Sequence, residues 1–258
     1  MKSQEEIELQ SSKVPQTQNA EEKVLTGREG LGLIKACTAK VEGINPVDFL
    51  STPEGKEAMK QKKFVLSGPP RSGKSCLRQG LKDVIKQVSN GTVYPYVLTA
   101  CPDGEGSWFQ ESMNNDPVMA AKLKSEYKTK FSPEFVDRIS ESVTKLSLPL
   151  SFIDIGGIIS PENERICKDA NGAILICGET AAKNGDPIKW KEFFTKLNIP
   201  IVAELYSDYL GTSDVVDGIE EDGVFRGSVH HLERGENLTD RETIKALSNF
   251  IIDLGKEK

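Results

Sequence analysis

Short apolar segments alternate with helix-like segments along the chain from residue 64 onward. The apolar segments are rich in β-branched residues, which is typical of buried strands. They cover 64–68, 93–100, 148–157, 173–178, 199–206 and 224–232. The stretches with helical periodicity cover 74–89, 108–146, 161–170, 187–197 and 240–254. Strand and helix therefore alternate over most of the chain.

This alternation predicts the fold class. Strands that are apolar on both faces are typical of a parallel sheet with helices on each side. We therefore expect an α/β fold, a three-layer sandwich around a mostly parallel, doubly wound sheet. The stretch 108–146 predicts a helical insertion between the second and third core strands. In such sheets ligands bind at the carboxyl ends of the strands, so residues that directly follow strands are the first candidates for function.

The N-terminal part of the chain has a different composition. Residues 1–23 are rich in Gln, Glu and Ser, which predicts a disordered tail. Residues 24–63 contain capping residues and helix formers, which predicts a helical extension before the first core strand. Residues 64–258 then form the main domain.

Composition narrows the classes of function. The chain has 258 residues with 33 Lys and Arg against 39 Asp and Glu, so its formal charge of −6 argues against direct binding of duplex nucleic acid. No apolar run approaches the roughly 20 residues of a membrane helix. The acidic start of the chain does not resemble a signal peptide. Five cysteines without C-x-x-C spacing indicate reduced thiols, and we expect a cytoplasmic protein.

The segment from Gly68 to Ser75 carries the strongest motif, because it matches G-x-x-x-x-G-K-[ST] without departure. It lies between a predicted strand and a predicted helix. Glycines let such a loop point its N–H groups inward as an anion nest, and the helix dipole adds positive potential. Lys74 would hold the outer phosphates and the Ser75 hydroxyl would ligate Mg²⁺. The expected phosphate contacts are Gly68, Pro69, Pro70, Arg71, Ser72, Gly73, Lys74, Ser75 and Cys76.

A second motif, LSFIDIGG, places Asp154 at the carboxyl end of another predicted strand. A carboxylate there can hold Mg²⁺ beside Ser75, directly or through water. Gly156 and Gly157 would let the backbone pass close to a γ-phosphate, so Gly157 is an expected nucleotide contact. The alternative interpretation is that Asp154 only caps the turn that follows it.

The residues that would bind the acceptor are indicated less specifically by the sequence. The segment 101–109 leaves the second predicted strand with two carboxylates, Asp103 and Glu105, either of which could accept a proton or orient a water. Trp108 could stack on a base or brace the loop. The alternative is an ordinary turn with Trp108 in the core.

Basic residues in 113–146 could bring cations onto a transferring phosphoryl group, and Arg138 is the candidate catalytic cation. The alternative is a solvated helix face, because acidic residues balance the basic ones. Adjacent His230 and His231 make a poor metal pair, since they point to opposite sides of a strand. In 206–213, Tyr206 or Tyr209 could flank a nucleotide base.

The two motifs resemble those of the P-loop NTPases over about residues 64–254. The Gly-Gly after the acidic residue, and the lack of a C-terminal helical domain rich in arginine fingers, resemble the kinase and dethiobiotin-synthetase-like side of that family. In those relatives the acidic strand lies beside the phosphate-loop strand.

A narrower resemblance rests on four segments: FVLSGPPRSGKSCLRQGL, TACPDGEGSWFQES, FIDIGGIISPENERIC and GVFRGSVHHLERGE. Together they resemble the P-loop domain found fused to a CRISPR-associated ring nuclease in type III antiviral signalling by cyclic oligoadenylates. This resemblance implies ATP binding and a link to that pathway. Residues 1–63 are too short and too polar for the ring-nuclease domain itself, so ring cleavage is not carried over, and a separate subunit would supply it.

Two functions are therefore predicted. The first is ATP–Mg²⁺-dependent phosphoryl transfer to a small acceptor such as a nucleotide or an oligoadenylate fragment, with Asp103 or Glu105 activating the acceptor. The second is a switch that binds or hydrolyses ATP and thereby controls assembly with a ring-nuclease subunit or with another copy of the chain. A pure nucleic-acid binder would need a basic stripe that the sequence does not indicate.

Overall fold

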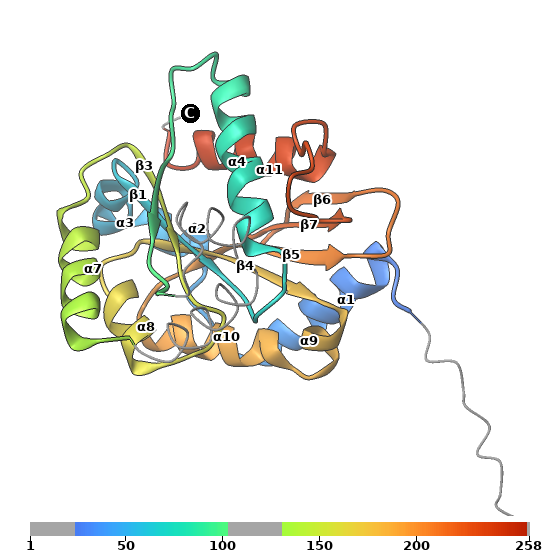
Figure 1. The fold of residues 1–258 in the computed structure, drawn as a ribbon, viewed down its shortest axis with the longest axis horizontal. Helices are drawn as coiled ribbons and strands as arrows, with labels where there is room; N and C mark the ends of the chain where they lie inside the picture. The colour runs from blue at the N-terminus through green and yellow to red at the C-terminus, as the bar shows by residue number, and fades with distance from the viewer. Residues whose placement is uncertain (1–23, 103–130, 257–258) are drawn as a thin grey trace, which may run out of the picture.

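A seven-stranded sheet runs through the part of the chain that the computed structural model describes, residues 24–102 and 131–256 (Figure 1). Neighbouring strands are parallel except for the last pair, which is antiparallel. Across the sheet the strands are β2 (Tyr96–Thr99), β3 (Leu150–Asp154), β1 (Lys62–Ser67), β4 (Gly172–Gly178), β5 (Ile201–Asp208), β7 (Phe225–His230) and β6 (Val215–Ile219). The described residues thus form the predicted α/β arrangement with a mostly parallel sheet.

Helices connect most of these strands. In chain order the described helices are α1 (Gly27–Thr38), α2 (Pro46–Ser51), α3 (Pro53–Ala58), α4 (Lys74–Val88), α7 (Pro133–Lys145), α8 (Pro161–Cys167), α9 (Glu179–Lys183), α10 (Asp186–Lys196) and α11 (Glu242–Asp253). Several begin with Pro in the first turn after a capping side chain, which satisfies exposed N–H groups there.

The two faces of the sheet pack into separate cores because side chains alternate along each strand. In β1, Phe64 and Leu66 join the core beneath α4 and α11, whereas Val65 between them joins the core beneath α1, α7, α8 and α10. All three side chains are fully buried. Figure 1 shows α4 and α11 on one side of the sheet and α1, α9 and α10 on the other, so the described part is layered as predicted.

Helix α1 belongs to one of these covering layers. It packs against β5 and β7, and a Cβ added at Gly30 would lie 2.1 Å from the ring of Tyr206. Only glycine lets the helix approach the sheet this closely. The expectation of a helical segment over 24–63 agrees with α1, α2 and α3, but α1 is a layer of the sandwich rather than an extension outside it.

Two elements differ from the sequence expectations. The edge strand β6 was not predicted, because Asp217 and Gly218, the latter with a positive φ of 78°, interrupt its short apolar run. Of the predicted helical insertion 108–146, the described part is α7, which packs against α8. The remainder, within 103–130, lies outside the described residues.

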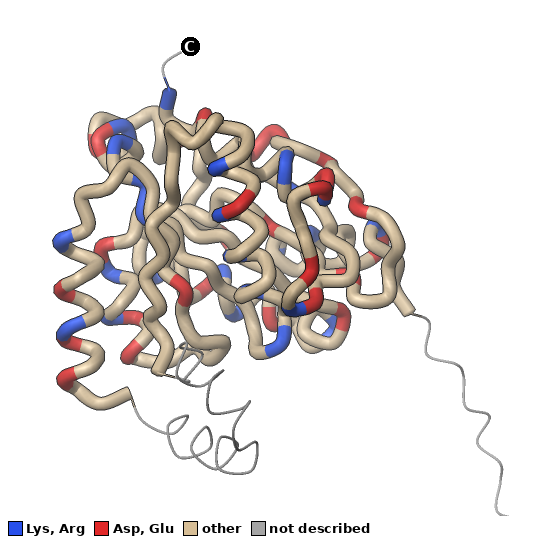
Figure 2. Tube along the Cα trace, turned by 45° about the horizontal axis from the view of Figure 1, so that its top comes forward, with Lys and Arg blue, Asp and Glu red and all other residues tan. Residues whose placement is uncertain are grey.

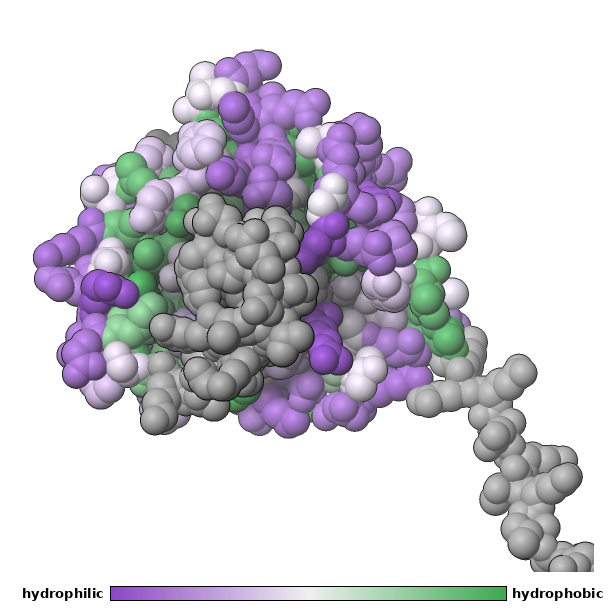
Figure 3. Space-filling view, viewed as in Figure 1, coloured by the Kyte–Doolittle hydropathy of each residue, from purple (hydrophilic) through white to green (hydrophobic). Residues whose placement is uncertain are grey.

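Charged residues of both signs are spread over the described chain (Figure 2). Figure 2 shows Lys and Arg interspersed with Asp and Glu. In the view of Figure 3 the described surface is mostly hydrophilic, with hydrophobic residues in small patches. Among the described residues, no helix combines the length and the apolar character needed to cross a membrane.

Candidate phosphate-binding site

The segment Gly68–Ser75, which we call the phosphate loop, connects β1 to α4 at the carboxyl edge of the sheet (Figure 1). Its first glycine has φ 134°, and a Cβ there would lie 2.0 Å from the Ile176 carbonyl oxygen in the neighbouring strand β4. Gly73 is the left-handed N-cap of α4, with φ 89°. Side chains would be strained at both positions, so these two glycines allow the loop to fold tightly over the end of β1.

Lys74 stabilises the loop from within. Its Nζ donates hydrogen bonds to the carbonyl oxygens of Gly68 and Pro69, both at 2.8 Å. The ammonium group therefore lies over the start of the loop, at the N-terminus of a helix whose first N–H groups lack helical partners. The Lys74 charge and the dipole and N–H groups of the α4 N-terminus thus lie together at one loop, which is an arrangement that favours anions.

Two further features indicate a ligand at this loop. Arg71 has a positive φ of 63° and an exposed side chain, a strained conformation for a non-glycine residue. The buried Ser72 hydroxyl has no hydrogen-bond partner among the described residues. An anion in the loop would supply an acceptor for such a hydroxyl. Cys76 lies in the first turn of α4 and packs against the core, so it can contribute only its backbone to a phosphate site.

Asp154 ends β3, which pairs directly with β1, as the family resemblance implies. Its carboxylate accepts a hydrogen bond from Nη1 of Arg78 on α4, at 2.7 Å. Because Arg78 lies three residues after Ser75, the two side chains share one face of α4. The pair therefore places the Asp154 carboxylate on the side of the helix that carries the Ser75 hydroxyl.

The loop after Asp154 touches the phosphate loop. A Cβ added at Gly157 would lie 2.5 Å from the backbone nitrogen of Pro70, so the two backbones are in direct contact. The buried Asn163 side chain donates to the carbonyl oxygens of Gly156 (3.3 Å) and Ile158 (2.7 Å) and so fixes the residues on either side of Gly157. The structure thus brings together the two motifs that are separate in the sequence.

The Ser160 hydroxyl caps α8, since it accepts from the backbone N–H of Asn163 at 3.3 Å. The bracing of Gly157 by the Asn163 side chain and the Arg78–Asp154 pair were missed. The available signals were the spacing of Arg78 one turn after Lys74, and the position of Asn163 at the start of a helix that follows the second motif.

The structure does not place the residues predicted for the acceptor side at the phosphate loop. Asp103, Glu105 and Trp108 lie outside the described residues. Arg138 lies on α7 with an exposed side chain whose guanidinium stands 5.7 Å from the ring of Phe135, and its described contacts do not include the phosphate loop. The structure so far agrees with the solvated-face alternative for Arg138.

The aromatic and histidine candidates separate into buried and exposed groups. Tyr206 is buried, and its hydroxyl donates to the Leu25 carbonyl oxygen at 3.3 Å, which is a structural role. Burial raises the pKa of its phenol. Tyr209 is exposed and stacks on His231 with ring centroids 5.3 Å apart. His230 contacts Asp214 through Nδ1 at 2.6 Å, whereas His231, which lies just beyond β7, contacts the Tyr209 carbonyl oxygen at 3.1 Å.

The cysteines are all free, and Cys37, Cys167 and Cys177 are buried. Burial raises the pKa of the Cys167 and Cys177 thiols far above the ordinary value, so both remain protonated and unreactive. The described part contains no cluster of three or more His, Cys, Asp or Glu residues that could hold a metal ion by itself. The oxygen donors Ser75 and Asp154 fit Mg²⁺ that also binds phosphates, because Mg²⁺ commonly takes one or two protein ligands in such sites.

Comparison with known proteins adds nothing to this description. No family model matches the chain. No curated protein matches it either. The functional argument therefore rests on the residues of the chain and on the geometry of the site.

Proposed function

We propose that the protein binds ATP with Mg²⁺ in the phosphate loop and transfers the γ-phosphoryl group to a small acceptor. The observation that carries this proposal is the contact between Gly157 and Pro70, because it joins the loop to the strand end that carries Asp154. A lysine, two oxygen donors and a helix N-terminus then converge on one anion-binding loop.

Each residue of the loop has a role in this proposal. On binding, the Lys74 ammonium exchanges the Gly68 and Pro69 carbonyl oxygens for phosphate oxygens. The buried Ser72 hydroxyl gains the acceptor that it lacks among the described residues. Ser75 and Asp154 supply oxygens to Mg²⁺, which neutralises charge on the phosphates when bound. The backbone of Gly157 closes the side of the site nearest the γ-phosphate.

The acceptor and its pathway rest on sequence alone. Asp103 or Glu105 is proposed to activate the acceptor, which we take to be a nucleotide or an oligoadenylate fragment. The link to type III CRISPR signalling, and the pairing with a ring-nuclease subunit, rest on the four segments that resemble that family. The proposal that the loop binds ATP does not depend on these parts.

A second candidate function is a switch without an acceptor, and one observation favours it. Ile158 and Ile159 follow Gly157 directly, and their side chains are 70% and 40% exposed. Two exposed isoleucines on the loop that contacts the phosphate loop would let the bound nucleotide control the docking of a partner. In this alternative ATP is hydrolysed slowly, and assembly is the output.

The experiment that tests these proposals uses ATP labelled at the γ-phosphate, followed by chromatography of the products. Label on an organic molecule supports phosphoryl transfer, and label only in free phosphate supports the switch. Lys74→Ala is expected to lower turnover by about a hundredfold or more, because the developing charge loses its cation. Lys86→Ala is the matched control, since Lys86 is exposed on the same helix. If calorimetry detects no binding of ATP or GTP with Mg²⁺ present, both functions are wrong.

A further inference from the structure

Arg78 lies one helical turn inside α4, four residues after Lys74 and three after Ser75. Residues three and four apart are neighbours on a helix surface, so all three side chains share one face. Arg78 Nη1 donates to Asp154 Oδ2 at 2.7 Å, which is the distance of a charge-assisted hydrogen bond. A permanent cation is therefore bound to the carboxylate that the proposed function assigns to Mg²⁺.

The surroundings make this pair stronger than an ordinary surface ion pair. The Arg78 side chain is 23% exposed and the Asp154 side chain is 11% exposed. Partial burial lowers the local dielectric constant, which strengthens attraction between opposite charges and repulsion between like charges. A guanidinium and a divalent cation beside the same carboxylate would therefore repel each other strongly.

We propose that Arg78 and Mg²⁺ are alternative partners of Asp154, so that Arg78 holds the carboxylate until a metal–nucleotide complex displaces it. This inference rests on the proposed function, since it assumes a metal at Asp154. Arg78 is then a positioning residue that acts through Asp154. It keeps the carboxylate neutralised in the absence of ligand, and it discourages binding of the metal without the triphosphate.

The chemistry of arginine suits this role. The guanidinium presents its N–H donors in a planar fork that suits the oxygens of a carboxylate and of a phosphate equally. When Asp154 turns to the metal, the released guanidinium needs new acceptors, and the phosphate oxygens of a nucleotide supply them. The metal alone offers no such acceptors. The pair therefore couples the entry of the metal to the entry of the nucleotide.

The test measures binding of Mn²⁺, as a probe for Mg²⁺, to the full chain without nucleotide, using electron paramagnetic resonance of the free ion. Arg78→Met removes the competing charge and is expected to bind Mn²⁺ about tenfold more tightly than the unaltered protein. Arg78→Gln serves as a second variant with a polar side chain. Lys86→Met removes one positive charge from the same helix at an exposed position and should leave Mn²⁺ affinity unchanged.

A second arm shows whether the gained metal site is Asp154. Adding Asp154→Asn to Arg78→Met should abolish the gain in Mn²⁺ affinity. A gain that persists in the double variant, or equal Mn²⁺ affinities in the single Arg78 variants and the unaltered protein, overturns the inference. Circular dichroism confirms that each variant is folded.

This outcome can be separated from failure of the proposed function. The unaltered protein is titrated with ATP at saturating Mg²⁺ in parallel. Absence of ATP binding there refutes the proposed function. ATP binding by the unaltered protein, together with unchanged Mn²⁺ affinity in both Arg78 variants, refutes only the role of Arg78.

Discussion

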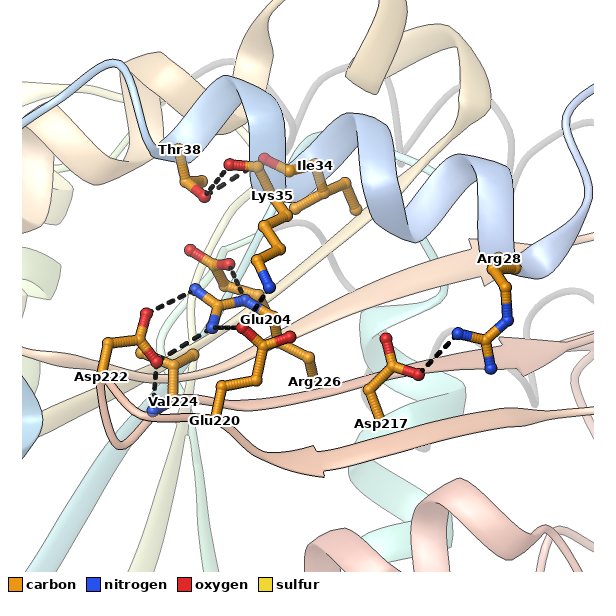
Figure 4. Close-up of polar contacts among 10 residues, drawn as sticks. All are labelled: Arg28, Ile34, Lys35, Thr38, Glu204, Asp217, Glu220, Asp222, Val224 and Arg226. Carbon is orange, nitrogen blue, oxygen red and sulfur yellow. Dashed lines mark hydrogen bonds and ion pairs between the residues drawn. The ribbon is translucent and has the colours of Figure 1, made fainter.

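Two arginines, Arg226 and Arg78, bind carboxylates in different ways. Arg226 of β7 is 5% exposed and makes four hydrogen bonds to Glu204, Glu220 and Asp222, at 2.8 to 2.9 Å (Figure 4). Lys35 of α1 adds an ion pair to Glu220. Arg78, by contrast, forms one ion pair within the described residues, with Asp154 at the phosphate loop. The first arginine is enclosed by acceptors, whereas the described contacts of the second use one of its five N–H donors.

The polar groups around Arg226 and around Arg78 also differ in how far their hydrogen bonds are satisfied. A cavity of about 190 Å³ borders the Arg226 cluster, but the lining carboxylates Glu204 and Asp222 both bind Arg226 already, and the lining Lys191 donates to the Thr38 carbonyl oxygen. Around Arg78, the described structure holds a strained Arg71 backbone and an unsatisfied Ser72 hydroxyl. Satisfied polar groups fix a fold, while unsatisfied and strained groups indicate a ligand. We therefore assign stability to the Arg226 cluster and ligand binding to the phosphate loop.

The largest expected effect is the loss of stability when the Arg226 cluster is broken. Arg226→Met leaves three carboxylates without their shared cation, so the free energy of unfolding is expected to fall by about 3–5 kcal/mol. Urea unfolding measures the change. The control is Arg28→Met, because Arg28 is 71% exposed and its described ion pair is with Asp217 at the surface, so its loss should change stability by less than about 1 kcal/mol. Equal effects of the two variants would contradict the comparison.

A smaller effect, on ATP affinity and on stability, is expected at the contact between Gly157 and Pro70. Gly157→Ala places a Cβ against the Pro70 backbone, which cannot move without deforming the phosphate loop. We expect ATP affinity to fall by about tenfold, with a stability cost of about 1–3 kcal/mol. Calorimetry and urea unfolding measure the two quantities. Gly178→Ala at the end of β4 is the control, because its Cβ would meet Ser207 at an ordinary 3.6 Å. Unchanged ATP affinity in Gly157→Ala would remove the main support for the proposed site.

The smallest expected effect is a pH dependence of stability that comes from Lys62, at the start of β1 and away from the phosphate loop. Burial lowers the pKa of Lys62 to about 8, and its Nζ donates to the Ile252 carbonyl oxygen at 2.9 Å. Between that pKa and the ordinary value of 10.5, the unfolded chain binds a proton that the folded chain lacks. Stability therefore rises with pH over this window, by on the order of 1 kcal/mol once solvent near the side chain is allowed for.

Urea unfolding between pH 8 and 10.5 tests this rise. Lys62→Met should flatten the dependence, whereas Lys60→Met, an exposed change two residues earlier, should preserve it. A slope that is the same in all three proteins would show that Lys62 titrates normally.

The strands and helices of the sandwich followed closely from local patterns. The helix predicted over 74–89 is observed as Lys74–Val88, and the strand predicted over 173–178 as Gly172–Gly178. Both have strong periodicity that matches their final burial. Edge strand β6 was missed because Asp217 and Gly218 interrupt its short apolar run, which an edge strand can tolerate since it buries little of its surface. Helix α1 was expected in outline only, and its place on the sheet depends on contact between Gly30 and the distant Tyr206.

The sequence by itself determined the phosphate loop, because a motif of contiguous residues needs only a strand before it and a helix after it. It also indicated Asp154, since a carboxylate at a strand end is a local feature. Only the tertiary structure decided that Arg78 binds Asp154 and that Gly157 touches Pro70. These contacts join residues some 76 and 87 positions apart, and their geometry depends on which strands are neighbours in the sheet. Local patterns carry no information on that order, which results from the packing of the whole fold.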